Sequence, residues 1–231
     1  MLGHLAELRN RIFIALAAVV VGGIVAYIFA PDIIDFLLSY YQHAIHDPHK
    51  KLVFLGPAEG FLNRLKVATY GGIVLALPVW LYQLWRFVTP GLNPREKRYA
   101  IPFVVSAIVL FLLGALAALL TLEPALSFLV NAGGSSQEAF LTADKYLSLV
   151  SLMIVAFGAS FEFPVVLVFL LIAHVLKVEQ LQHARRWAVV GIFLFAAVIT
   201  PSQDPYSLFF MAVPMCLFYE GSILIGRILR R

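Results

Sequence analysis

The sequence predicts an all-α polytopic membrane protein with six transmembrane helices, and three observations carry this prediction. Hydrophobic residues make up 61% of the 231 residues and charged residues only 13%, whereas soluble domains carry about 25% charged residues. The apolar residues form six long runs almost free of charge, and lysine and arginine gather at alternate ends of these runs. This composition excludes a soluble enzyme core, and we expect residues 1–231 to form a single membrane domain.

The six apolar runs define the predicted spans. They cover residues 12–29, 67–88, 99–122, 146–175, 187–199 and 208–225. A helix needs about 20 apolar residues to cross a 30 Å hydrocarbon core. The last two runs are therefore short, and we expect them to form a close helix pair around which the bilayer thins. Pro78 predicts a kink within the second span.

The distribution of basic residues predicts that both termini are cytoplasmic. One side of the predicted membrane carries Arg9, Arg11, Arg86, Arg95, Lys97, Arg98, Lys177, Arg185, Arg186, Arg227, Arg230 and Arg231. The other side carries Lys50, Lys51, Arg64, Lys66 and Lys145. Short cytoplasmic loops are enriched in lysine and arginine. Membrane topology therefore accounts for the net charge of +4, and we expect no nucleic-acid partner.

Two outer segments join the predicted spans. Residues 30–66 are rich in apolar and aromatic side chains, which predicts short helices at the membrane surface, and residues 124–145 form the second outer loop. At the end of the second span, Tyr82, Trp85 and Phe87 are typical of an interfacial aromatic belt.

No motif of recognised catalytic form is present. The chain contains no GxxxxGK[ST] loop, HExxH helix or GxSxG elbow, and its single cysteine, Cys216, excludes an intrachain disulfide. His43, His46 and His49 have a spacing that could hold a metal on a helix, but the segment DPHKK interrupts any helix there, so we interpret them as a polar surface. We expect no enzyme activity, cofactor or metal.

Glu162 is the most informative single residue, because it lies within the fourth apolar run, two residues before Pro164. A carboxyl group inside the membrane is costly and faces a polar partner or a water-filled cavity. One interpretation is a structural hydrogen bond to a neighbouring helix. The others are a proton site or a contact with a translocating substrate or a partner helix.

Two further acids lie on the predicted cytoplasmic rim. Glu7 and Arg11 have the i,i+4 spacing of a helix-surface ion pair. Asn93, Pro94 and Glu96 have the pattern of a helix start, with the acid at the third helical position. These local roles leave both carboxylates beside basic residues and available to a cationic ligand.

Together these segments resemble the TatC family, the polytopic receptor subunit of the twin-arginine protein translocase, across nearly the whole chain. The resemblance rests on HLAELRNR (4–11), GPAEGF (56–61), LPVWLYQLWRFVTPGLNPREKR (77–98), AFGASFEFPVVL (156–167), ITPSQDP (199–205) and AVPMCLFYE (212–220). The chain departs from the family where TPSQDP replaces the usual TPPD-type turn before the last span.

The resemblance implies a bundle of six helices curved like a cupped glove, with both termini cytoplasmic, whose cytoplasmic rim binds the twin-arginine motif of signal peptides on folded cargo. Glu7 and Glu96 match the family's acidic recognition positions. The residues implied to shape the patch around them are Leu8, Arg9, Arg11, Leu92 and Arg95.

The resemblance also implies that Glu162 and Pro164, which match the family's FE-x-P motif, meet partner subunits inside the membrane. The implied partners are TatA- and TatB-like single-span subunits, with self-association in a receptor complex. The implied setting is the inner or plasma membrane of a prokaryote, where the proton gradient drives export.

Two rival interpretations remain. A proton- or cation-coupled secondary transporter would use Glu162 as its carrier carboxylate, but such transporters show paired midplane acids or broken helices in both halves, and only Glu162 lies deep. A structural scaffold would use every acid for helix caps and interhelical hydrogen bonds. Replacing Glu7 and Glu96 without an effect on export would favour the scaffold.

Overall fold

A computed structural model describes residues 2–45, 49, 51–88, 100–132 and 141–229, and these residues are helical apart from short connections and one isolated β-bridge between Val53 and Thr142. The helices in this part of the chain are α1 (Leu2–Ile28), α2 (Ala30–Ala44), α3 (Glu59–Leu75), α4 (Leu77–Val88), α5 (Ala100–Asn131), α6 (Ala143–Phe161), α7 (Phe163–Ile172), α8 (Val178–Ile199) and α9 (Pro205–Leu229). The prediction of an entirely helical chain is confirmed for this part.

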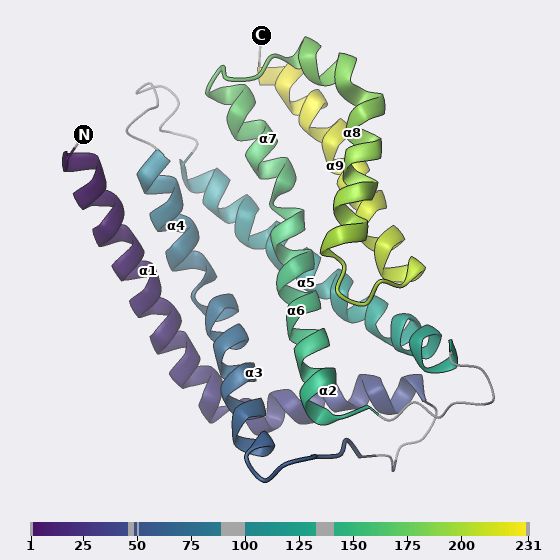
Figure 1. The fold of residues 1–231 in the computed structure, drawn as a ribbon. Helices are drawn as coiled ribbons and strands as arrows, with labels where there is room; N and C mark the ends of the chain where they lie inside the picture. The colour runs from purple at the N-terminus through teal and green to yellow at the C-terminus, as the bar shows by residue number, and fades with distance from the viewer. Residues whose placement is uncertain (1, 46–48, 50, 89–99, 133–140, 230–231) are drawn as a thin grey trace.

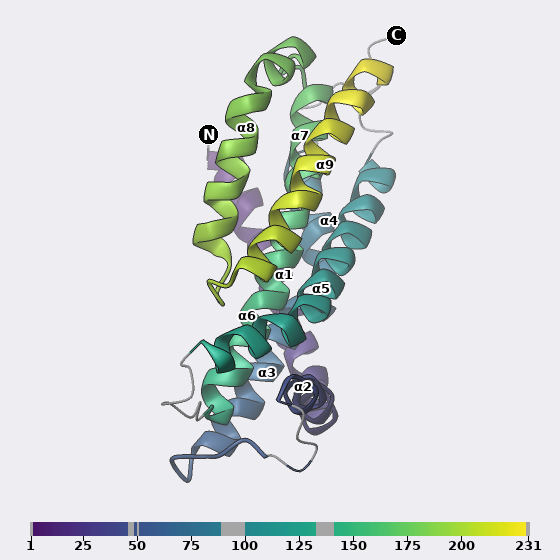
Figure 2. The same cartoon turned by 90° about the vertical axis from the view of Figure 1, so that its right-hand side faces the viewer.

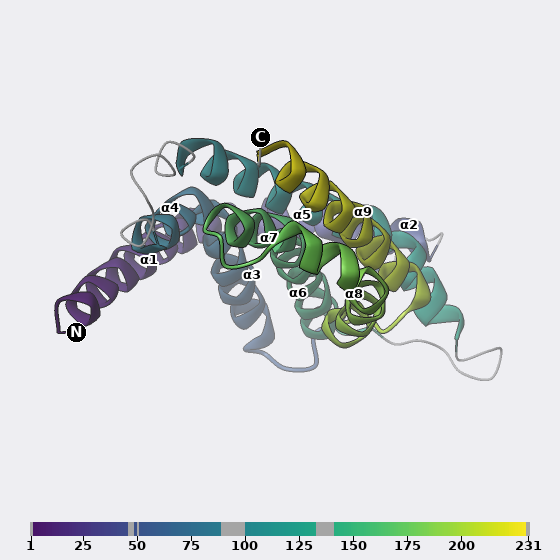
Figure 3. The same cartoon turned by 90° about the horizontal axis from the view of Figure 1, so that it is seen from above.

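The helices form two arms that diverge toward the end of the molecule that holds both termini (Figure 1). In one arm, α1 packs along α3 and α4. The other arm contains α6 and α7 in line, with α9 packed beside them and α8 packed against α9 (Figure 2). Helix α5 contacts α4, α6 and α9 and so connects the arms, and α2 lies across the opposite end. Seen along the arms, α1 and α8 occupy opposite flanks (Figure 3).

The kink predicted at Pro78 is confirmed, because α3 and α4 are separated at Ala76 and meet at an angle of 51°. Pro78 lacks an N–H and its ring excludes a continuous helix. The bend places the indole of Trp80 over the preceding turn, where its Nε1 donates a hydrogen bond of 3.1 Å to the Ile73 carbonyl. The tryptophan thus satisfies a backbone acceptor that the break leaves free.

Four helical segments of the described chain are long and apolar enough to cross a membrane: Ala6–Ile28, Ile101–Asn131, Ala143–Ile172 and Pro205–Ile228. The bent pair of α3 and α4 is a fifth candidate. Helix α8 lacks a sufficiently apolar window, because Glu179, His183, Arg185 and Arg186 occupy its first half. The sixth span therefore stays a prediction.

Several helices continue beyond the apolar runs from which they were predicted. Helix α5 does not end at Leu122 but passes through Pro124 and runs to Asn131, so the second outer connection begins later than expected. The lost hydrogen bond at Pro124 is offset by packing, since Leu122, Ala125 and Leu126 are all fully buried. Helices α8 and α9 have 22 and 25 residues, because polar ends extend their apolar runs.

Glycines allow two pairs of helices to approach backbone to backbone. A Cβ atom at Gly72 of α3 would lie 2.7 Å from the Val19 carbonyl oxygen and the Gly23 nitrogen of α1. A Cβ atom at Gly114 of α5 would lie 2.5 Å from the Phe157 carbonyl oxygen of α6. Small residues at such crossings are the usual means of tight helix packing in membranes. These crossings set the positions of α4 and α6, which carry the candidate site.

The helix expected after the first span is α2, which has Pro31 in its first turn and buries Ala30, Leu37, Tyr41 and Ala44. Tyr146 of α6 donates a hydrogen bond of 2.5 Å to the Leu37 carbonyl and fixes α2 against the second arm. The end of the molecule opposite the termini is therefore closed by packing, while the arms separate at the other end (Figure 1).

Candidate functional site

Glu162 lies at the short break between α6 and α7, and its main chain joins the two helices. Its N–H donates to the Ala159 carbonyl at 3.2 Å, and its own carbonyl accepts from the Val166 N–H at 3.1 Å. Pro164, buried in the first turn of α7, cannot donate a helical hydrogen bond. The Glu162 backbone is therefore hydrogen-bonded on both sides of the break.

The Glu162 side chain lines an apolar pocket of about 360 Å³ between α4, α5, α6 and α7. The pocket is lined by Trp80, Leu81, Leu84, Trp85, Phe103, Val104, Ala107, Ala159, Glu162, Val165, Val166 and Phe169. Within the described part of the chain, the buried Oε1 of Glu162 has no hydrogen-bond partner. The interpretation of Glu162 as a structural interhelical hydrogen bond therefore finds no support among these residues.

Three aromatic rings form one wall of this pocket. The centroids of Trp85 and Phe103 lie 4.3 Å apart, and Phe169 lies 5.5 Å from Trp85 and 5.9 Å from Phe103. The prediction that Trp85 belongs to an interfacial belt is wrong, because its side chain is only 6% exposed and packs in this cluster. Tyr82, on another face of α4, remains exposed.

Sequence reasoning missed the residues that form this wall with Trp85. The signal was present on α4, where Leu77, Leu81 and Trp85 recur every four residues and therefore share one helix face. Phe103 and Phe169 carried no such signal, since they come from α5 and α7 and meet Trp85 only through tertiary packing.

The second group of candidate residues lies near the start of α1. The predicted ion pair is confirmed, because Arg11 donates from Nη2 to Oε1 of Glu7. The Glu7 side chain is 39% exposed and that of Arg11 only 12%. The Nε and Nη1 of Arg11 are buried without hydrogen-bond partners in the described chain. Leu8 is half-buried and Arg9 is exposed.

Glu96, Leu92 and Arg95 lie outside the described residues. The helices on either side, α4 ending at Val88 and α5 beginning at Ala100, reach the same end of the molecule as the start of α1 (Figure 1). A common patch of Glu7 and Glu96 stays a prediction. Glu162 is separate from this end, because it lies at the junction of α6 and α7, within the apolar segment Ala143–Ile172.

The fold and the pocket define a class of protein: a helical multi-pass membrane protein with two diverging arms and a buried carboxyl group facing an apolar pocket. Among the described residues, no three His, Cys, Asp or Glu side chains are grouped so as to hold a metal ion. The pocket and the charged groups near the start of α1 are suited to binding a ligand by charge and shape, inside the membrane and at its surface.

Sequence comparison identifies the family. Residues 3–214 match the family described as "Sec-independent protein translocase protein (TatC)", and the chain belongs to this family. The proteins named TatC from Frankia casuarinae and Aquifex aeolicus are 40% and 38% identical, over 96% and 99% of this chain. The chain spans 95% of the Aquifex protein but only 64% of the Frankia protein.

Solved structures agree with this assignment. A structure described as "Crystal Structure of Twin Arginine Translocase Receptor- TatC" matches with a TM-score of 0.80 at 38% identity, covering 99% of this chain and all of that one. A second, described as the same receptor in DDM, matches with a TM-score of 0.78 at 37% identity. The chain is therefore a multi-pass component of a bacterial protein translocase, a non-enzymatic transport family, and works with other subunits of that translocase.

Proposed function

We propose that this chain is the receptor and core subunit that binds twin-arginine signal peptides at its cytoplasmic face and supports export of folded proteins. The observation that carries the proposal is the Glu7 carboxylate. It is partly exposed near the start of α1, within the family motif, and a guanidinium already binds it. A site that holds one guanidinium has the geometry to hold another.

The chemistry favours arginine over lysine in such a site. A planar guanidinium binds a carboxylate through two parallel N–H donors, whereas an ammonium acts as a point charge. Arg9 and Arg11 make the surroundings positive, so a cationic peptide needs specific carboxylate contacts to bind there. Glu96 supplies the second carboxylate, and Leu8, Leu92 and Arg95 shape the patch between them.

The pocket at Glu162 fits a helix of a partner subunit within the membrane. Its walls are apolar and aromatic. Oε1 of Glu162, which has no hydrogen-bond partner among the described residues, would bind a hydrogen-bond donor on that helix. Pro164 maintains the break that directs Glu162 into the pocket. TatA- and TatB-like single-span subunits are the partners of this pocket, and α8 and α9, with their short apolar runs, form a second docking edge.

In the proposed arrangement the chain lies in the inner or plasma membrane of a prokaryote with both termini cytoplasmic, and it self-associates in the receptor complex. The proton gradient supplies the energy. The position of both termini at one end of the molecule supports this topology (Figure 1).

A proton- or cation-coupled secondary transporter is the second candidate. The observation in its favour is that Oε1 of Glu162 has no hydrogen-bond partner in the part of the chain that the structure describes. It is the weaker candidate, because a carrier of this kind is expected to show a second broken helix with a midplane acid. Among the described residues, the bent pair α3–α4 has no such acid, and the interrupted segment α6–α7 has only Glu162.

The decisive experiment measures binding of a labelled signal peptide to the purified chain in nanodiscs at fixed salt. Peptides with Arg-Arg and Lys-Lys are compared for the wild type and for Glu7→Ala combined with Glu96→Ala. We expect the Arg-Arg peptide to bind better and the double variant to lose about 2 to 5 kcal/mol of binding free energy, as for truncation of a desolvated charge pair.

The matched control is Asp32→Asn, which removes an exposed acid at the opposite end of the molecule. It should leave binding unchanged. If the wild type does not distinguish the two peptides, or the double variant binds like the wild type, the receptor proposal is wrong and solute-coupled transport through Glu162 becomes the hypothesis to test.

A further inference from the structure

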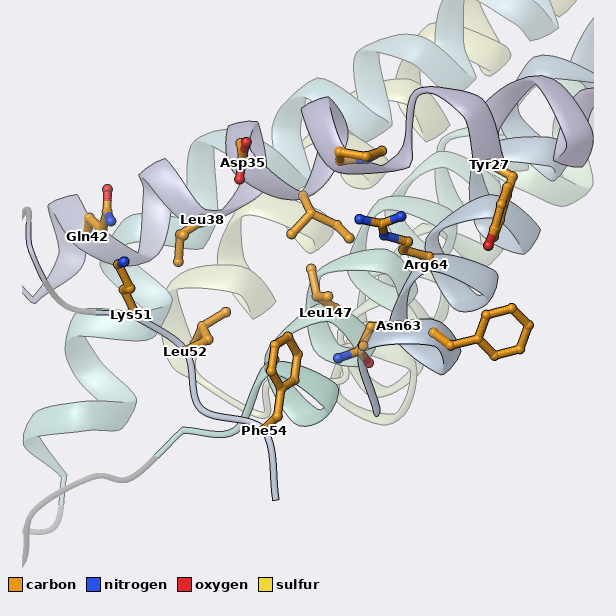
Figure 4. A pocket seen from close by; sticks show the side chains of 15 residues that line it. Tyr27, Asp35, Leu38, Gln42, Lys51, Leu52, Phe54, Asn63, Arg64 and Leu147 are labelled. Carbon is orange, nitrogen blue, oxygen red and sulfur yellow. The ribbon is translucent and has the colours of Figure 1, made fainter. Parts of the chain in front are cut away.

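A second pocket, of about 650 Å³, lies at the end of the molecule opposite both termini, between α2, the start of α3 and α6 (Figure 4). Asp35 of α2, Lys51 of the segment before α3, and Asn63 and Arg64 of α3 line it together with apolar and aromatic side chains, among them Phe54 and Phe61. The candidate receptor patch lies at the other end of the molecule, and the Glu162 pocket is lined by different residues.

Asn63 is the first sign that this pocket takes a ligand. Its side chain is only 1% exposed, and neither Oδ1 nor Nδ2 has a hydrogen-bond partner in the described chain. A buried amide without partners is rare in native proteins, because the lost hydration is not replaced. A polar group entering the pocket would replace it.

The charges of the pocket are the second sign. Lys51 and Arg64 are exposed and make no hydrogen bond or ion pair with other described residues. By contrast, Lys66, also on α3, binds Asp144 at 2.5 Å and Ser148 at 2.6 Å. Among the described residues that line the pocket, Asp35 is the one acid, so two cations face one anion. An anionic ligand is therefore favoured.

The third sign is the position of the pocket along the membrane-crossing helices. Tyr27 lines the pocket and stands one residue before the end of the apolar segment Ala6–Ile28. Phe61, in the first turn of α3, lines the pocket and is exposed. Ile28 at the end of α1 and Leu65 on α3 are also exposed, and these two helices pack against each other. The polar groups of the pocket therefore lie next to exposed apolar side chains, as the headgroup of a phospholipid lies next to its acyl chains.

We propose that this pocket binds the phosphate of an anionic membrane phospholipid in the leaflet at the end opposite the termini. Arg64 donates to the phosphate oxygens as a planar fork, and the Asn63 amide completes the polar floor. Lys51, toward the other end of the pocket in Figure 4, adds electrostatic attraction. The apolar walls hold the glycerol and the first methylene groups. This inference depends on the chain lying in a membrane and not on signal-peptide binding.

The test is native mass spectrometry of the full purified chain, delipidated in detergent and titrated separately with phosphatidylglycerol, phosphatidylethanolamine of the same acyl chains, and inorganic phosphate. We expect phosphatidylglycerol to bind best. Arg64→Gln should lower its affinity roughly five-fold, as expected for one basic residue beside an anionic lipid, Lys51→Gln should lower it less, and Asp35→Asn should raise it.

Lys145→Gln is the matched control, because Lys145, in the first turn of α6, is exposed, carries the same charge and does not line the pocket. The proposal is overturned if this variant loses as much affinity as Arg64→Gln, if phosphatidylethanolamine binds equally well, or if inorganic phosphate displaces the lipid at similar concentration. Thermal unfolding without lipid checks that each variant folds.

Should Arg64→Gln fail to fold, a photoreactive phosphatidylglycerol with its reactive group near the glycerol tests the wild type directly. Cross-linked peptides containing Phe54 or Phe61 are expected. Cross-links confined to other segments would overturn the proposal. Neither readout involves a signal peptide, so this inference and the receptor proposal fail independently.

Discussion

The carboxyl groups of Glu7 and Glu162 lie in different environments, and this difference suits them to different roles. Glu7 is partly exposed near the start of α1 and already binds Arg11. Glu162 is deep in the α6–α7 segment, and its Oε1 has no hydrogen-bond partner among the described residues. The first is suited to exchange one guanidinium for another in water. The second is suited to a partner that enters from the membrane.

Arg11→Gln tests whether the internal guanidinium competes with the peptide. Removing Arg11 should strengthen binding of the Arg-Arg signal peptide by about 0.2 to 1 kcal/mol, the range measured for partly exposed ion pairs. The measurement is peptide affinity in nanodiscs at fixed salt. Arg9→Gln removes an exposed neighbouring charge and serves as the control. Equal effects of the two variants would show that only net charge matters.

Glu162→Gln separates a structural from a functional carboxyl group. Because a buried carboxyl group without a partner is costly, the amide should leave thermal unfolding unchanged or stabilise the fold by up to about 2 kcal/mol, while export of folded cargo falls. Unfolding in nanodiscs and export by whole cells are the two measurements.

Glu123→Gln, which changes an exposed acid on α5, should affect neither quantity. A marked loss of stability in Glu162→Gln would contradict the prediction, since it would mean that the carboxyl group holds the fold together.

At the scale of elements, backbone contacts at glycines decide how the arms are built. Gly72 packs against Gly23 and Val19 where α3 crosses α1, and Gly114 packs against Phe157 and Gly158 where α5 crosses α6. The second crossing positions the face of α5 that carries Phe103 and Ala107, which line the Glu162 pocket. The shape of the pocket thus depends on a contact made two turns away.

Gly114→Ala should destabilise the fold by about 1 to 3 kcal/mol, because the added Cβ would lie 2.5 Å from the rigid Phe157 carbonyl oxygen. Gly191→Ala on α8 is the matched control, since a Cβ there meets nothing within 4 Å. That variant should be neutral or stabilising by up to about 1 kcal/mol, because alanine favours the helix. Thermal unfolding in one detergent compares them, and equal stabilities would contradict the tight crossing.

At the scale of the whole molecule, the arms meet at one end, beside α2, and diverge at the other, where both termini lie (Figure 1). The two proposed binding regions lie at these different ends of the molecule. The receptor patch belongs to the divergent end, and the phospholipid pocket belongs to the packed end. The Glu162 pocket lies between them, within the membrane-crossing segments.

Labelling of single cysteines checks the topology. In a Cys216→Ser background, which removes the one native cysteine, Leu55→Cys and Val175→Cys place exposed thiols at opposite ends of the molecule. A membrane-impermeant maleimide added to intact cells should label position 55 at once and position 175 only after permeabilisation. The reverse order would place the termini outside and overturn the proposed orientation.

Much of the candidate site was predictable because its signals are local. The Glu7–Arg11 pair follows from i,i+4 spacing, and the exceptional position of Glu162 follows from an acid within an apolar run. The meeting of Trp85 with Phe103 and Phe169, and the pocket around Asn63 and Arg64, were not predictable, because their residues come from segments far apart in the chain.

The sequence by itself determined that the chain is helical, lies in a membrane, bends at Pro78 and belongs to the TatC family, because composition, local spacing and family motifs are properties of the chain alone. Only the tertiary structure decided that α5 continues through Pro124 and that Trp85 faces inward. It also decided that Oε1 of the half-buried Glu162 and the amide of the buried Asn63 have no hydrogen-bond partner among the described residues. Burial and hydrogen bonding depend on which distant segments pack together, and the local periodicity of the sequence does not specify these long-range contacts.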